Sequence, residues 1–115
     1  MFKKILVPVD LAHIEAIQRA LSTSADLARH YGAEVCYMAV TTSTPGTVAR
    51  TPEEYEHKLE AFASGQEAVH GQKTSSRCIN SPDPTADLDG LILKSIEAVG
   101  ADLVVMATHL PRHLD

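Results

Sequence analysis

Apolar runs of strand length alternate with helical patterns along this 115-residue chain, and this alternation restricts its fold more than any other feature. The apolar runs predict strands over 4–10, 34–40, 73–79 and 103–108, of which 73–79 is polar enough to lie at a sheet edge. Residues 42–50 are predicted to form a solvated loop. Apolar residues at helical spacing predict helices over 13–31, 52–70 and 85–99. Tyr55 and Val69 are expected on the core stripe of the second of these helices, and Leu88 on that of the third. Alternation with short links is typical of an α/β fold with an open parallel sheet and right-handed crossovers. A chain of this length forms one domain, residues 1–115.

Helix boundaries carry residues with known capping preferences. Thr51 is predicted to cap the second helix, where Glu54 would complete a capping box. Asp83 is predicted to cap the third helix. Gly32 and Gly100 are predicted to end the first and third helices in a left-handed conformation. These signals support the assigned order of elements.

Charge and composition argue against several classes of function. The net charge is −5 and the basic residues are scattered, whereas binding to nucleic acid needs a concentrated basic face. Pro8 and Asp10 end the N-terminal apolar run far short of a signal sequence or membrane span. Cys36 and Cys78 lie in apolar runs and are interpreted as reduced thiols of a cytoplasmic protein, with a disulfide or redox pair as the alternative.

The ends of the first and fourth strands are the predicted place for a ligand. If the strand order is 3-2-1-4, the chain reverses direction between these strands, and ligands of open parallel sheets bind at such a reversal. Asp10 and the 107–109 segment then flank the crevice. The Asp10 carboxylate can accept hydrogen bonds from a ribose or base, or cap the first helix. Both roles stay open, and they are compatible.

Signals for catalysis or a metal are weak. His109 and His113 have the spacing of a metal-binding pair, but Pro111 breaks the helix that would align them, so a loop is the favoured interpretation. Arg112 and a histidine near the crevice could instead contact phosphate. Glycine-rich phosphate loops and a nucleophile elbow are absent from the sequence. We therefore expect neither an enzyme nor a metal site.

Two segments resemble the universal stress protein family. Residues 1–10 (Met-Phe-Lys-Lys-Ile-Leu-Val-Pro-Val-Asp) resemble its opening strand, and 100–109 (Gly-Ala-Asp-Leu-Val-Val-Met-Ala-Thr-His) its fourth strand. Segments 33–40 and 82–96 also fit, so the resemblance spans nearly the whole chain. It implies a Rossmann-like, flavodoxin-like domain with strand order 3-2-1-4-5, usually dimeric and cytoplasmic, in which many members bind ATP.

The resemblance also implies particular site residues. Asp10 would lie near the ribose and adenine, and Val40 or a neighbour would meet the adenine through its backbone. The nucleotide-binding residues expected on this basis are Pro8, Val9, Asp10, Val40, Met106, Ala107 and His109. The chain departs from the family's glycine loop, with Ala107 and Leu110 at its first two glycine positions. A family variant with a His-x-Pro segment, here residues 109–111, has the same departure.

Two functions remain open at this stage. The first is a stress-response module that binds ATP or another adenine nucleotide at the carboxyl ends of strands one and four. The second is a member that binds no nucleotide and acts as a dimeric interaction module. The family's fourth helix and fifth strand are missing before Asp115. We expect the natural protein to continue past this residue, or a partner chain, most simply a second copy, to cover strand four.

Overall fold

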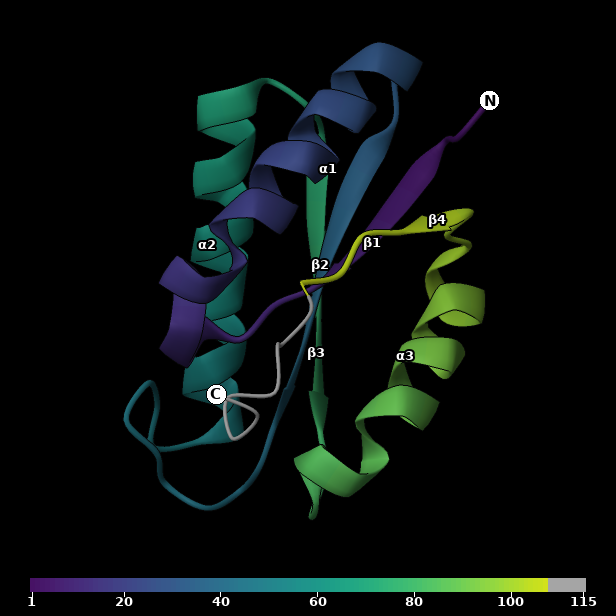
Figure 1. The fold of residues 1–115 in the computed structure, drawn as a ribbon. Helices are drawn as coiled ribbons and strands as arrows, with labels where there is room; N and C mark the ends of the chain where they lie inside the picture. The colour runs from purple at the N-terminus through teal and green to yellow at the C-terminus, as the bar shows by residue number, and fades with distance from the viewer. Residues whose placement is uncertain (108–115) are drawn as a thin grey trace, which may run out of the picture.

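The computed structural model describes residues 1–107, apart from the side chain of Thr85. Its core is a parallel sheet of β1 (Lys4–Pro8), β2 (Glu34–Thr41), β3 (Thr74–Asn80) and β4 (Leu103–Val104). The strand order is β3-β2-β1-β4, which confirms the predicted topology (Figure 1). The polar strand β3 lies at an edge of the sheet, as expected from its sequence.

Helices cover both faces of the sheet. α1 (Gln18–Tyr31) and α2 (Pro52–His70) pack on one face, and α3 (Pro84–Val99) packs on the other (Figure 1). Right-handed crossovers explain this division, because the connections from β1 to β2 and from β2 to β3 step in one direction, whereas the connection to β4 returns past β1. No helix within residues 1–107 is long and apolar enough to span a membrane.

The central strands are buried on both sides, which explains their nearly continuous apolar sequences. In β1, Ile5 and Val7 belong to the core under α1 and α2, while Leu6 belongs to the core under α3. All three side chains have no exposed surface. Such two-sided burial is typical of parallel strands covered by helices.

The predicted helix caps form with one difference. The Thr51 hydroxyl accepts a hydrogen bond from the Glu54 N–H (3.1 Å), and the Asp83 carboxylate accepts one from the Ala86 N–H (3.3 Å). The Glu54 carboxylate accepts the N–H of Arg50 (2.6 Å), where a capping box would use that of Thr51. Glu54 therefore binds the residue before the cap, and the capping box is incomplete.

Gly32 and Gly100 adopt the predicted left-handed conformation, with φ of 67° and 72°. Each N–H closes the preceding helix on a backbone oxygen of its last turn. A side chain at either position would strain the backbone, which accounts for glycine there.

Three predicted elements need correction. The first helix is split into η1 (Leu11–Ile17), a 3₁₀ segment with a non-helical residue at His13, and then α1. The 3₁₀ segment forms because Asp10 closes the turn, accepting the His13 N–H through its carbonyl (2.9 Å). β4 has only two residues where 103–108 was predicted, since its ladder with β1 pairs only two residues; position 108 lies outside the described residues. Val69, predicted on the core stripe of α2, is 74% exposed, because the buried face of that helix continues from Ala63 to the half-buried Gln66 and His70 instead.

Candidate functional site

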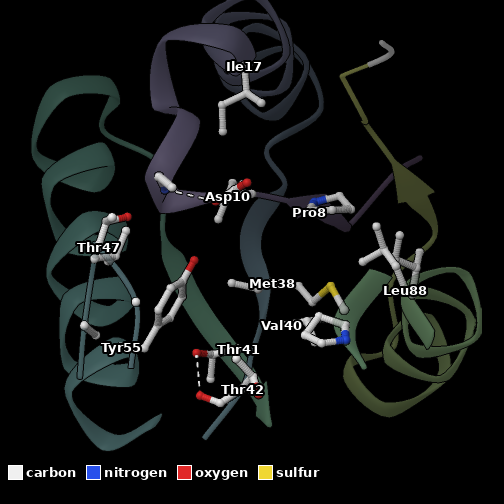
Figure 2. A pocket seen from close by; sticks show the side chains of 18 of the residues that line it. Pro8, Asp10, Ile17, Met38, Val40, Thr41, Thr42, Thr47, Tyr55 and Leu88 are labelled. Atoms are coloured by element: carbon white, nitrogen blue, oxygen red, sulfur yellow. Dashed lines mark hydrogen bonds between the residues drawn. The ribbon is translucent and has the colours of Figure 1, made fainter. Parts of the chain in front are cut away.

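A cavity of about 520 Å³ opens at the carboxyl ends of the strands. Its walls come from the ends of β1 and β2, the 42–49 loop, the first turns of α2 and α3, and the residues after β4 (Figure 2). Its volume falls within the range of small-molecule sites. The cavity lies where the strand order reverses, since β1 pairs with β2 on one side and with β4 on the other.

The structure brings six of the seven predicted site residues together around this cavity. They come from three separate strand ends, and they are Pro8, Val9, Asp10, Val40, Met106 and Ala107. The seventh, His109, lies outside the described residues, as do Leu110 and Arg112. The strand order predicted that the ends of β1 and β4 would lie side by side here, and the family resemblance added Val40 from β2.

Asp10 is the charged residue among the described side chains that line the cavity. One carboxylate oxygen accepts the Ala12 N–H (2.9 Å), and the other lies 2.9 Å from His13 Nδ1. The side chain remains 58% exposed. The capping role expected from the sequence is therefore present, and Asp10 also faces the cavity (Figure 2).

The end of β2 offers backbone groups to the cavity. In a parallel ladder, alternate residues direct their N–H and C=O to the same neighbouring strand. Glu34 donates to the Lys3 carbonyl (3.1 Å), and the Met38 carbonyl accepts the Val9 N–H (2.8 Å). Alternate β2 residues starting from Glu34 thus face β1, and Val40 is the next in this series.

β1 has ended before it reaches Val40. Among residues 1–107, the hydrogen bonds outside the regular ladders include none to the N–H or C=O of Val40. Thr41, by contrast, faces β3 and accepts the Ser81 N–H (2.8 Å). The backbone N–H and C=O of Val40 are therefore adjacent to each other, and both are directed toward the cavity side of β2.

Tyr55 is a lining residue that sequence reasoning assigned only to the core stripe of α2. Its phenol oxygen accepts the Leu11 N–H (3.2 Å), which links the first turn of α2 to the segment after β1. Burial raises the pKa of the Tyr55 phenol, and the negative charge of Asp10 raises it further, although the hydrogen bond from Leu11 acts in the opposite direction. The helical spacing carries no signal that distinguishes this tyrosine from an ordinary core residue.

The loop between β2 and α2 was predicted only as a solvated connection. In the structure it forms one wall of the cavity, and Thr42, Thr44 and Thr47 are among its lining residues. A turn closed by Gly46 N–H and the Ala49 carbonyl (2.9 Å) shapes it. Ala49 packs against the core, which anchors the wall.

Leu88, predicted to lie in the core, also faces the cavity and is 37% exposed. In the part of the chain that the structure describes, no three His, Cys, Asp or Glu side chains gather as metal ligands would.

Comparison with known proteins identifies relatives of this fold. A universal stress protein family member from Burkholderia pseudomallei has a TM-score of 0.71 and 22% identity, over 93% of this chain and 82% of that chain. A universal stress protein from Archaeoglobus fulgidus has a TM-score of 0.63 and 21% identity, over 92% and 76% of the two chains.

A third structure is a universal stress protein in complex with cAMP, with a TM-score of 0.63 and 17% identity over 90% of this chain and 75% of that chain. No curated protein matches the chain. The model of the universal stress protein family matches residues 1–115. The chain therefore belongs to the universal stress protein family.

Proposed function

We propose that this protein is a stress-response module that binds an adenine nucleotide in the cavity and leaves it chemically unchanged. The proposal rests on one observation: Val40, whose backbone N–H and C=O are directed toward the cavity, and the Asp10 carboxylate line the same cavity. These groups match the two ends of an adenine nucleoside. Asp10 lies at the ribose end of the proposed ligand, and Val40 at the base end.

The base end is supported by hydrogen-bond chemistry. Adenine presents an amino donor beside a ring-nitrogen acceptor. The C=O of Val40 can accept from that amino group while its N–H donates to the ring nitrogen. Guanine and hypoxanthine carry an oxygen in place of the amino group, which would face the Val40 carbonyl as a second acceptor. The arrangement thus favours adenine over other purines.

The ribose end is supported by the spare acceptor capacity of Asp10. An ionised carboxylate has about four acceptor positions, and the turn after β1 uses two. The remaining positions can accept from ribose hydroxyls. The contacts with the Ala12 N–H and the His13 ring hold the Asp10 carboxylate in one orientation for binding.

Titration calorimetry tests this function directly. We expect adenosine and ATP to bind, and inosine to bind at least about tenfold more weakly than adenosine, since an unpaired buried acceptor costs about 1–3 kcal/mol. Native mass spectrometry of gently purified protein would show whether an adenine nucleotide is carried along. Equal affinity for adenosine and inosine would refute recognition through Val40, and absence of binding by either would refute the proposed function.

A second candidate is a dimeric interaction module, alone or together with nucleotide binding. It is favoured by the outer side of β4, where no strand within residues 1–107 pairs. Met106, next to this edge, is 49% exposed. A second copy of the chain is the simplest partner, since two-fold symmetry lets one edge cover itself. Cys36 and Cys78 are free thiols, which supports a reducing, cytoplasmic location.

A further inference from the structure

Tyr55 reaches into the cavity from the helix on its far side. It lies in the first turn of α2, behind the Thr51 cap, and only 8% of its surface is exposed. In Figure 2 its phenol oxygen points from the wall toward the part of the cavity where Asp10 lies. The Leu11 N–H that binds this oxygen belongs to the peptide that directly follows Asp10. The phenol oxygen is thereby held close to the Asp10 turn.

The hydrogen bonds of this phenol are incomplete. A tyrosine hydroxyl can accept and can also donate one hydrogen. The oxygen accepts from Leu11, and among residues 1–107 the hydroxyl hydrogen has no acceptor. Buried polar hydrogens in native proteins normally have partners. The missing acceptor is therefore expected on the molecule that fills the cavity.

The protonation state allows this donation. Burial and the nearby Asp10 charge together keep the phenol pKa above its ordinary value of 10.0. The hydroxyl therefore carries its hydrogen at neutral pH. Asp10 is an acceptor only, so the two side chains present opposite hydrogen-bonding characters to the same region of the cavity.

We propose that Tyr55 is a specificity-determining residue that donates its hydroxyl hydrogen to one ribose hydroxyl oxygen of the ligand, while Asp10 accepts from the ribose. This inference rests on the proposed function and extends it, because it makes the site selective for ribonucleosides over deoxyribonucleosides. A ribose hydroxyl is both donor and acceptor, so it satisfies an acceptor and a donor at once. A deoxyribose lacking that hydroxyl would leave the Tyr55 hydrogen without a partner.

Replacement of the hydroxyl tests the inference. Tyr55→Phe keeps the ring, and Tyr37→Phe is the matched control, because Tyr37 is 1% exposed in the same core but does not line the cavity. Calorimetry with adenosine, 2′-deoxyadenosine and 3′-deoxyadenosine would be run on each protein. We expect Tyr55→Phe to weaken adenosine binding by about tenfold. The loss should vanish for the deoxynucleoside that lacks the contacted hydroxyl, and Tyr37→Phe should bind all three as wild type does.

A purely structural role for Tyr55 would give a different result. It would lower the affinity for all three nucleosides by the same factor, and this would overturn the inference. Unchanged adenosine affinity in Tyr55→Phe would overturn it as well, while leaving the proposed function intact. Failure of the wild-type protein to bind adenosine or ATP would instead remove the proposed function and this inference together.

A second measurement avoids mutation. In wild-type protein with ¹³C-labelled tyrosine rings, a new hydrogen bond from the phenol changes the Cζ resonance of Tyr55. We expect this resonance to shift on adenosine binding and to shift less with the deoxynucleoside that lacks the contacted hydroxyl. Equal shifts with all three nucleosides would contradict the proposed contact, even if Tyr55→Phe did not fold.

Discussion

Asp10 has more hydrogen-bond acceptor positions than its turn consumes, so local structure and ligand binding do not compete for it. The same carboxylate accepts the Ala12 N–H and approaches the His13 ring, yet more than half of its side chain remains exposed. Both interpretations of Asp10 from the sequence are therefore compatible with the geometry. Substitutions can separate them, because an N-cap tolerates residues that a ligand contact does not.

Asp10→Ala should weaken nucleotide binding by about 1–3 kcal/mol, because a ribose donor loses its acceptor. Asp10→Asn retains N-cap geometry. It should therefore keep wild-type stability while losing the charge and part of the affinity. Calorimetric titration with ATP, with thermal melting as the stability control, measures both effects. Equal ATP affinities in wild type and Asp10→Ala would leave Asp10 as a helix cap only.

Asp102 is a second carboxylate with a structural task, at the opposite end of the sheet. It accepts the N–H groups of Lys3 (2.9 Å) and Lys4 (3.1 Å), which joins the start of β1 to the start of β4. These hydrogen bonds from Lys3 and Lys4 lower the pKa of the Asp102 carboxyl below its ordinary value of 3.8. Its ionised form is therefore favoured in the folded protein.

Asp102→Asn should lower the stability at pH 7 and have a smaller effect in acid. The folded-state pKa lies below the unfolded value of 3.8, so the stabilising contribution is present above pH 3.8 and is lost as the pH falls through the lowered pKa. Urea unfolding of wild type and variant at pH 7 and pH 3 would measure the difference. If the difference in the free energy of unfolding between wild type and Asp102→Asn were the same at both pH values, this role would be contradicted.

At the scale of elements, the junction of η1 and α1 positions the cavity wall. η1 carries the chain away from the end of β1, and α1 then packs along the sheet. Ile17 lies at this junction, is 7% exposed, and both lines the cavity and belongs to the core. The junction therefore couples the stability of the fold to the shape of the site.

Ile17→Ala and Leu21→Ala should each destabilise the protein by about 2–5 kcal/mol, since both side chains are buried against the sheet. Ser22→Ala, at an exposed position of α1, is the control and should change stability by less than about 0.5 kcal/mol. Denaturant unfolding decides between the outcomes. A stability change at Ile17 or Leu21 as small as that of an exposed site would mean that another face of α1 packs on the sheet.

Capping residues and strand patterns were sufficient to predict α2, α3 and the alternation of strands with helices, because these signals are local. The strand order is not a local signal, and it followed from the family resemblance. Thr51 and Asp83 show this, since each binds an N–H within its own helical turn. The split of η1 from α1 was not predictable, because apolar spacing continues through the 3₁₀ segment and conceals the bend at His13. Helical spacing also misplaced Val69, because the half-buried positions in the last turns of α2 are Gln66 and His70.

The candidate site was also predictable only in part from the sequence. Asp10 and Ala107 were predictable, because topology fixes where parallel strands finish. Val40 was expected from the family resemblance. Tyr55 and Thr47 were not, since they reach the cavity from a helix and a loop whose positions depend on tertiary packing. Periodic spacing in the sequence does not indicate that a residue on the far wall lines the site.

For the whole molecule, the two edges of the sheet are not equivalent. β3 is a seven-residue polar strand packed under α2, whereas β4 has two residues. The apolar Val105 and Met106 follow β4. Polar sequence is one way in which natural edge strands avoid pairing with other chains. The β4 edge lacks this protection within the described residues, so self-association is expected there.

Light scattering should give a molar mass twice the 12.4 kDa of one chain. Met106→Lys places a charge beside the β4 edge and should shift the protein toward monomer. Val69→Lys is the control, because Val69 is 74% exposed on α2, which packs against β3 at the opposite edge of the sheet, and its variant should remain dimeric. A monodisperse monomer for the wild type over a wide concentration range would contradict a dimer at this edge.

The position of β1 has a consequence for how the protein is made. Of these four strands, β1 is synthesised first, yet it lies between β2 and β4 in the sheet. One edge of β1 can pair once Glu34–Thr41 is synthesised. Its other edge has no partner until Leu103–Val104 is synthesised. For most of translation, the nascent chain therefore carries an apolar strand with one open edge, the state in which strands of different chains pair. A chain stalled before Leu103 should therefore aggregate more readily than the finished chain.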